Sequence, residues 1–274
     1  MVDDYTASPQ PADTVRVQLS DPQGHVYEDT LAEEVPLSLF VQGESYAVFM
    51  RTPGADRALI CGFLLTEQLI EDLDDVQSIT PCASYPHTRL HLNLESGVRL
   101  VPRSRHSFIS SSCGVCSLSQ LNLEADAPRL ERDPLWEGRS LSSADLKRHL
   151  EQFNQLPSLF SRTGGAHIAA LFNRQGEPRY SQDDVGRHNA VDKVIGAAHL
   201  DGERSLSGWV LVVSSRAGFE IVNKAVTAQV GALVTLGAAS GAAHRYAVAS
   251  GLPLYSFARP NRAHVHVSLT SRES

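Results

Sequence analysis

The sequence predicts an α/β protein in which a smaller, antiparallel β-rich N-terminal part precedes a layered α/β part. Two patterns point to this class. Short apolar runs separated by glycine turns fill the chain up to about Val101, whereas strands alternate with helices after Pro157. Such alternation is typical of a layered sheet that is at least partly parallel. The 274 residues, 42% of them hydrophobic and 20% charged, suffice to bury a substantial core.

The β-rich part is expected to begin with a strand and a hairpin. Residues Thr14 to Leu19 alternate between apolar and polar side chains, as they would in a half-buried strand. The apolar runs 33–41 and 46–50 flank Gln42-Gly43-Glu44, which predicts a β-hairpin.

One helix and a second pair of strands complete this part. The spacing from about Asp56 to Ile70 is helical, and its apolar residues share one face: Leu59, Ile60, Phe63, Leu64 and Ile70. Cys61 lies within this helix, so we expect a packed thiol. The leucines of 90–94 alternate along a strand, after which Ser96-Gly97 predicts a turn and 98–101 a returning strand.

The second part is expected to alternate regularly. Ser142 or Ser143 is placed to cap a helix that runs to about Phe153. Strands are then predicted at 167–172, 209–213, 232–236, 253–257 and 265–267, and helices at 189–199, 219–230 and 242–250.

These elements divide the chain into three regions. Residues 1–13 are acidic and contain prolines without an apolar core, so we expect a disordered lead-in. The β-rich part covers 14–125, and the α/β part covers 140–274.

Composition excludes several classes of protein. The formal net charge of −7 argues against broad binding to nucleic acid. No run of about 18 apolar residues predicts a membrane span, and the N-terminus does not resemble a secretory signal. The four cysteines are few for this length, so a cytoplasmic protein with reduced thiols fits better than a disulfide scaffold.

Cys113 and Cys116 form a Cys-x-x-Cys pair in a run of serine and glycine that predicts a surface loop. Such a pair has three common uses: two ligands of a zinc site, a dithiol redox centre, or a sulfur relay through a persulfide. Zinc would need two more ligands, which the spacing of Cys61, Cys82 and His106 does not supply in a recognised pattern. A mobile relay suits the serine- and glycine-rich surroundings.

A second group of polar residues lies in the string 183–193. His188 and Asp192, like Asn189 and Lys193, are one helical turn apart and are expected off the buried face. The string therefore predicts either a solvated helix face with ion pairs or the polar wall of a cleft. Arg187 and His188 would lie near a helix N-terminus, where an anion is favoured.

Further segments favour phosphate groups. Gly164-Gly165 precedes a strand, and 237–241 links a strand to a helix, although a tight turn is the commoner explanation for such glycines. The tail Phe257-Ala258-Arg259-Pro260-Asn261-Arg262 combines an aromatic ring with two guanidinium groups that can stack on a purine and bind phosphate. Its alternative interpretation is a positively charged chain end. Neither a Rossmann fingerprint nor a P-loop is present.

Several strings together resemble the FdhD family of formate dehydrogenase accessory sulfurtransferases. They are 34–37, 62–67, 112–116, 163–167, 184–193 and 215–220, and they occur in the family's order. The string 184–193, Asp-Val-Gly-Arg-His-Asn-Ala-Val-Asp-Lys, is long enough to be specific alone, whereas the Cys-x-x-Cys is not.

The resemblance implies a cytidine deaminase-like fold in the larger part and a sulfur carrier as function. Sulfur would pass from a cysteine desulfurase, as a persulfide on Cys113 with Cys116 as its partner, to the molybdenum bis-guanine-dinucleotide cofactor before insertion into the formate dehydrogenase catalytic subunit. The segment 257–262 matches the family's cofactor-binding segment. The family also suggests a homodimer. The deaminase zinc signature is missing, so deamination is disfavoured and no zinc is expected.

Arg259, Arg262, Arg216 and His188 are the residues that we predict to contact phosphate or purine. Two segments differ from the family pattern: the turn after Gly237, which reads Ala238-Ala239-Ser240-Gly241, and the tail, which reads Pro260 and then His264-Val265-His266. Two alternative functions remain open at this point: a non-catalytic chaperone that binds the cofactor, and a zinc-stabilised interaction module.

Overall fold

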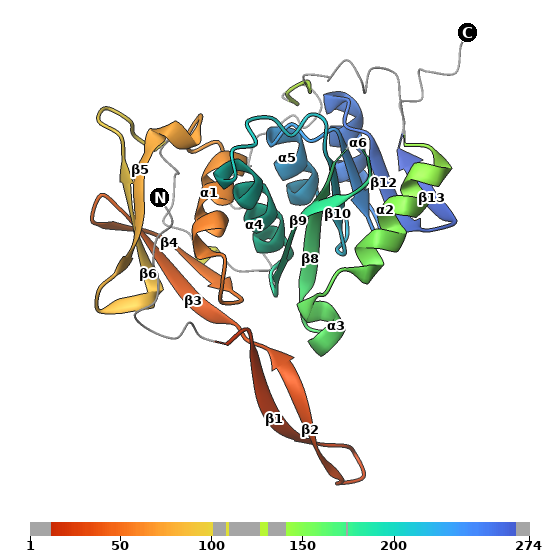
Figure 1. Ribbon diagram of the computed structural model, residues 1–274, viewed down its shortest axis with the longest axis horizontal. Helices are drawn as coiled ribbons and strands as arrows, with labels where there is room; N and C mark the ends of the chain where they lie inside the picture. The colour runs from red at the N-terminus through yellow and green to blue at the C-terminus, as the bar shows by residue number, and fades with distance from the viewer. Residues whose placement is uncertain (1–11, 101–107, 110–126, 131–140, 174, 267–274) are drawn as a thin grey trace.

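The computed structural model describes residues 12–100, 108–109, 127–130, 141–173 and 175–266. In Figure 1, β-rich elements lie on one side and an α/β sandwich on the other, with helices α1 (Asp56–Thr66) and α4 (Arg187–Leu200) side by side between them. We call these two sides the small lobe and the large lobe. No helix in the described ranges is long and apolar enough to cross a membrane.

The small lobe contains a hairpin and a five-stranded sheet around α1. Its strands and short helix are β1 (Thr14–Ser20), β2 (Val26–Ala32), β3 (Val35–Val41), β4 (Glu44–Arg51), η1 (Leu73–Asp75), β5 (Val76–Cys82), β6 (Tyr85–Leu94) and β7 (Phe108–Ile109). β1 and β2 form a separate antiparallel hairpin that projects from the body (Figure 1). The other strands have the order β5-β6-β3-β4-β7, and apolar side chains of α1 pack against them.

Most of the elements predicted for this lobe are confirmed, but two details are wrong. The sheet is mixed rather than antiparallel, because β3 pairs with β6 in parallel and β4 with β7 in parallel. Residues 98–100 form no strand, and Val101 lies outside the described residues. Both edges of β6 are already occupied, one by β5 and one by β3, so no edge remains for a returning strand.

The large lobe follows the predicted alternation of strands and helices. Besides α4 it contains α2 (Ser143–Gln155), α3 (Leu159–Thr163), β8 (His167–Phe172), β9 (Pro178–Asp184), β10 (Val210–Val213), α5 (Phe219–Thr227), β11 (Ala232–Thr235), α6 (Gly241–Ser250), β12 (Leu254–Arg259) and β13 (Arg262–His266). The sheet order is β13-β12-β11-β10-β8-β9. β10, β11 and β12 are parallel, and the remaining neighbours are antiparallel, so the expectation of a partly parallel sheet is confirmed.

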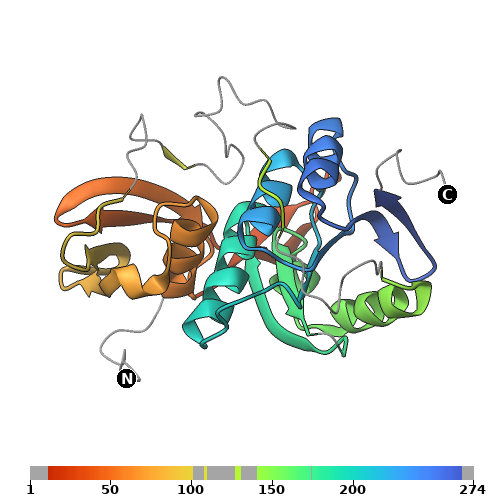
Figure 2. The ribbon, with the colours of Figure 1, turned by 90° about the horizontal axis from the view of Figure 1, so that it is seen from above.

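Helices cover both faces of this sheet. One face packs against the apolar sides of α4, α5 and α6, and the other packs against Leu146, Leu150 and Phe153 of α2 (Figure 2). Ser142 caps α2, because its hydroxyl accepts a hydrogen bond of 3.1 Å from the Asp145 amide. The lobe is therefore a three-layer sandwich, as its alternating pattern predicts.

The lobes meet where α1 crosses α4 at backbone contact distance. A Cβ atom on Gly62 would lie 1.8 Å from the Asp192 carbonyl oxygen, and one on Gly196 would lie 1.9 Å from the Ala58 carbonyl oxygen. Only glycine fits at either position, so two glycines set the distance between the lobes.

Candidate functional site

The predicted binding residues gather at the edge of the large sheet where its parallel strands end. Val213 of β10 pairs with Thr235 of β11, and the loops 214–218 and 236–240 leave these strands side by side. β9 runs in the same direction as β10, so α4, α5 and α6 all begin at this edge. The carboxyl edge of parallel strands, with helix N-termini facing it, is the usual ligand site of such sheets.

Arg216 and Gly237 bring the two loops into direct contact. A Cβ atom on Gly237 would lie 2.8 Å from the Arg216 Cα atom, and the Gly237 amide donates to the Ser215 carbonyl at 3.0 Å. Arg216 itself is exposed. The glycine thus permits a close approach that leaves the guanidinium group in solvent at the strand ends.

The segment 257–262 continues the same edge. Phe257 has a φ of 49°, in the left-handed region, and its amide donates to the Gly237 carbonyl at 2.9 Å. Phe257 is 43% exposed. The Arg259 Nη1 atom donates to the carbonyls of Leu236, at 2.8 Å, and Ala258, at 2.7 Å. The structure therefore brings Arg216, Phe257 and Arg259 together around Gly237.

The rest of the predicted segment and His188 are placed differently. Ala258 is buried, Pro260 is half-buried, and Asn261 and Arg262 are exposed at the turn between β12 and β13. His188 is buried in the first turn of α4, next to β9, and three strands separate β9 from β12 in the sheet. His188 is thus at the same strand-end edge but near the opposite end of the strand order, away from Phe257 and Arg259.

The polar face of α4 is buried, which contradicts the expectation that it lies off the buried face. Asn189, Asp192 and Lys193 are all at most 3% exposed. They face the small lobe rather than solvent, because α1 and the end of β4 pack over them. The ion pairs of this helix, Lys193–Asp184 and Asp192–Lys224, are therefore formed within the large lobe and covered by the small lobe.

A buried ion pair between α4 and β9 lies next to the end of β4, which hydrogen bonds join to α4. The Lys193 ammonium group lies 2.7 Å from the Asp184 carboxylate and donates to the Thr52 carbonyl at 2.8 Å. Asp184 also accepts from the Gly186 amide and from Asn189 Nδ2, and Asn189 Nδ2 donates to the Met50 carbonyl at 2.8 Å.

A second buried network joins α1, α4 and α5. The Lys224 ammonium group donates to both Asp192 carboxylate oxygens and to Glu67 Oε1, each at 2.9 Å, and Thr66 donates to Asp192 at 2.7 Å. Burial raises the pKa of Asp192 to about 6. The pKa of Lys224 is also raised, because the carboxylates of Asp192 and Glu67 outweigh the effect of burial, so the lysine stays charged.

Sequence reasoning missed Lys224 as an interior group, although a signal was present. Lys224 lies three residues after Ile221 and one before Ala225, on the apolar stripe of α5. A charged side chain on such a stripe indicates a buried partner.

His167 and Ser214 add two polar groups to the strand-end edge. His167 begins β8, and its Nδ1 atom lies 3.3 Å from the Ser214 hydroxyl, which accepts from the Ile168 amide. Burial lowers the pKa of His167, and the nearby Arg187 guanidinium lowers it further. The imidazole is therefore neutral at pH 7 and can exchange hydrogen bonds with a ligand.

Cys113 and Cys116 lie outside the described residues, so their predicted roles stay predictions. Described residues flank them on both sides: β7 pairs with β4 of the small lobe, and Ala127 and Leu130 pack against the large-lobe core. Of the two described cysteines, Cys61 is buried as predicted, and burial raises the pKa of its thiol to about 12. Cys82 is half-buried.

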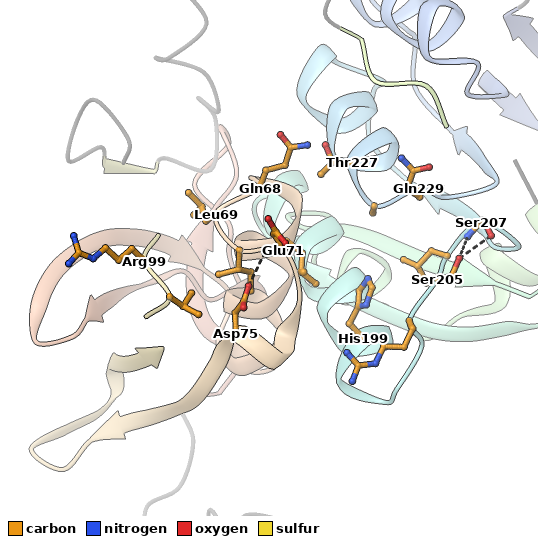
Figure 3. A pocket seen from close by; sticks show the side chains of 16 residues that line it. Gln68, Leu69, Glu71, Asp75, Arg99, His199, Ser205, Ser207, Thr227 and Gln229 are labelled. Atoms are coloured by element: carbon orange, nitrogen blue, oxygen red, sulfur yellow. Dashed lines mark hydrogen bonds between the residues drawn. The ribbon is translucent and has the colours of Figure 1, made fainter. Parts of the chain in front are cut away.

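A large cleft lies at the opposite edge of the large sheet. It has a volume of about 1140 Å³, and polar side chains such as Gln68, Glu71, His199 and Gln229 line it (Figure 3). Its walls include Ser205–Ser207 before β10 and Thr227–Gln229 before β11, so it opens at the amino ends of these strands. None of the described site residues predicted from the sequence lines it. Among the described residues, no three histidine, cysteine or acidic side chains are grouped as metal ligands.

Comparison with known proteins gives one consistent result. The model of the FdhD/NarQ family matches residues 32–271. The Sulfur carrier protein FdhD of Streptomyces avermitilis is 38% identical over 239 residues, covering 84% of each chain. That of Anaeromyxobacter dehalogenans is 37% identical over 261 residues, covering 89% of each.

A solved structure shares the fold. The crystal structure of a candidate formate dehydrogenase accessory protein from Desulfotalea psychrophila has a TM-score of 0.70 and covers 94% of this chain and 98% of its own. At 20% sequence identity, this likeness shows the common fold alone.

Proposed function

This chain belongs to the FdhD/NarQ family, and from that premise we propose that it carries sulfur to the molybdenum cofactor of a formate dehydrogenase. Relatives that bear the name sulfur carrier protein match it over more than four fifths of their length. In this proposal, the donor is a cysteine desulfurase and the acceptor is the bis-guanine-dinucleotide form of the cofactor, which is the substrate of the transfer.

Sulfur loading is a thiol exchange at Cys113. The Cys113 thiolate attacks the terminal sulfur of the desulfurase persulfide, a new S–S bond forms on Cys113, and the desulfurase thiolate leaves. Attack requires a thiolate, so the buried Cys61, whose pKa is raised to about 12, is a poor competitor.

Release uses the second thiol of the pair. The Cys116 thiolate attacks the inner sulfur of the Cys113 persulfide, a Cys113–Cys116 disulfide forms, and hydrosulfide leaves. The two thiols supply the two electrons that reduce the sulfur, so delivery to the metal needs no further reductant. Cellular thiols then reduce the disulfide for the next cycle.

The proposed cofactor site is the strand-end edge of the large lobe. The single observation that supports it is the convergence of Arg216, Phe257 and Arg259 around Gly237, from two loops and strand β12, which are distant in sequence. Guanidinium groups and the N-termini of α5 and α6 suit the diphosphate of a guanine dinucleotide, and the exposed Phe257 ring suits its base.

The test of sulfur carriage is mass spectrometry after incubation with a cysteine desulfurase and cysteine. We expect one added sulfur atom on Cys113, and the Cys116→Ala protein should retain that sulfur because release is blocked. Cys82→Ser is the matched control, since Cys82 is a half-buried thiol that should not change loading. An adduct found only on other cysteines contradicts the proposal.

Activation of the formate dehydrogenase by the Cys113→Ala protein distinguishes a sulfur carrier from a cofactor chaperone, and the metal content of the purified protein distinguishes it from a zinc-stabilised module. Cys113→Ala should abolish activation of the formate dehydrogenase if the chain carries sulfur. A cofactor chaperone without sulfur chemistry would still activate its client, and a zinc-stabilised module would purify with stoichiometric metal.

A further inference from the structure

Three histidines surround the backbone that presents the Phe257 ring. His244 lies in α6, and His264 and His266 lie in β13. The Nδ1 atoms of His244 and His266 are 3.0 Å apart, and His266 Nε2 lies 2.8 Å from the Ser256 hydroxyl. The His264 ring meets the Phe257 ring edge to face, with centroids 5.4 Å apart.

The contacts of His266 use both of its ring nitrogens. If His244 donates its Nδ1–H to His266, then His266 donates its Nε2–H to Ser256. In the reverse arrangement, Ser256 donates to His266 Nε2 and His266 donates its Nδ1–H to His244. In either case the two imidazoles are opposite tautomers, because only one of the facing Nδ1 atoms can carry the proton.

The hydrogen bonds between His244 and His266 and between His266 and Ser256 form a chain that ends next to a strained residue, Phe257. Ser256 is 1% exposed and directly precedes Phe257, whose φ of 49° is costly for a residue with a side chain. The strand register is irregular between Ser256 and Arg259. A strained, bulged residue keeps its conformation only when neighbouring contacts hold it. The hydrogen bond between His266 and Ser256, the residue directly before Phe257, is such a contact.

We propose that His266 is a positioning residue, which holds Phe257 ready to stack on a nucleotide base through the hydrogen-bond chain His244–His266–Ser256. This inference rests on the proposed function, because it takes Phe257 as the base contact. The His264 ring is inclined by 69° to the Phe257 ring, so it packs against that ring and does not stack on the same base. The ligand class is a purine nucleotide, whose flat base can stack on the Phe257 ring.

The hydrogen-bond chain His244–His266–Ser256 can accept one added proton on its two imidazoles but not two. A singly protonated pair keeps every contact, whereas two protonated imidazoles would face each other with Nδ1–H groups. No acidic residue occurs from 240 to 266, and the other charged groups of α6, β12 and β13 are Arg245, Arg259 and Arg262. Burial and the two neighbouring histidines lower the pKa of His266, so this imidazole is neutral at pH 7.

Nitrogen-15 NMR of the imidazoles tests the chain directly. We expect His244 and His266 to show opposite tautomers in the wild-type protein, and His244→Asn to remove the fixed tautomer of His266. Finding both histidines as the Nε2–H tautomer, which free imidazole prefers, overturns the chain.

Binding of GDP, used as the probe, tests the positioning. His266→Asn and Ser256→Ala should each weaken GDP binding about three- to tenfold, the equivalent of one hydrogen bond, while lowering the unfolding temperature by no more than about 4 °C. His25→Asn, at the exposed turn before β2, is the control and should bind as the wild type does. Unchanged GDP affinity in both test variants refutes the positioning role. If the wild-type protein binds no GDP, the proposed base contact is wrong. The NMR measurement of the tautomers then still tests whether the hydrogen-bond chain His244–His266–Ser256 exists.

Discussion

Lys224 shows how much a single buried charge determines in this protein. Its side chain is 5% exposed and contacts Asp192 within the large lobe and Glu67 across the boundary between the lobes. Bringing these charges out of water is costly, and their mutual contacts offset that cost only while all partners are present. Removing one partner is therefore worse than removing the whole group.

We expect Lys224→Met to lower the free energy of unfolding by about 3–5 kcal/mol, because it leaves the buried Asp192 carboxylate without its cation. Urea unfolding measures the change. The double variant Lys224→Met with Asp192→Asn should recover part of the loss, since it removes the uncompensated charge.

The matched control is Lys147→Met, which breaks the exposed pair with Glu151 in α2. Exposed pairs contribute about 0–1 kcal/mol, so this variant should be nearly neutral. Equal effects of the two lysine substitutions would show that the interior network contributes no more than a surface pair.

At the scale of elements, helices α1 and α4 pack so closely that their backbones touch. Gly62 and Gly196 each face a backbone carbonyl of the opposite helix. The predicted helices both exist, but nothing in their individual apolar spacing indicates that they touch. The motif strings 62–67 and 184–193 therefore meet in space and form one interface.

Gly62→Ala is expected to lower the free energy of unfolding by about 2–3 kcal/mol or more, because its Cβ would overlap the Asp192 carbonyl and push the helices apart. Thermal and urea unfolding measure the effect. Gly165→Ala is the control: its Cβ would meet nothing closer than 3.7 Å, so the change should stay within about 0.5 kcal/mol. A neutral Gly62→Ala would contradict the backbone contact.

Three strands that the sequence pattern does not predict, β2, β5 and β9, share a physical cause. β2 carries exposed and half-buried residues along its whole length, and β5 and β9 are half-buried at most positions, so their sequences lack the alternation that predicts a strand. Neighbouring strands, and not local pattern, hold them in place.

At the scale of the whole molecule, buried and partly buried histidines make stability fall in acid, whereas the raised pKa of Asp192 acts in the opposite direction. Burial lowers the pKa of His149, His167, His199 and His266. Below the ordinary histidine pKa of about 6.5, the unfolded chain takes up protons that the folded chain does not. Stability is therefore complete above that pH and declines as the pH falls toward the lowered pKa values.

We expect the unfolding temperature to fall between pH 7.5 and about pH 6, the range in which histidines titrate. His149→Gln should reduce this pH dependence, because it removes one of the histidines whose pKa burial lowers. Differential scanning calorimetry across this range measures both. An unfolding temperature that rises on acidification would contradict the assignment.

The amino-acid sequence by itself determined the α/β class, most helices and strands, the buried Cys61 and the family, because each depends on local spacing or on a continuous string of residues. Tertiary structure alone decided that the small sheet is mixed and that the polar face of α4 is buried. It also decided that Arg216, Phe257 and Arg259 surround Gly237. The physical reason is that these features depend on partners distant along the chain, such as Thr66 and Lys224 for Asp192, which no local pattern can pair.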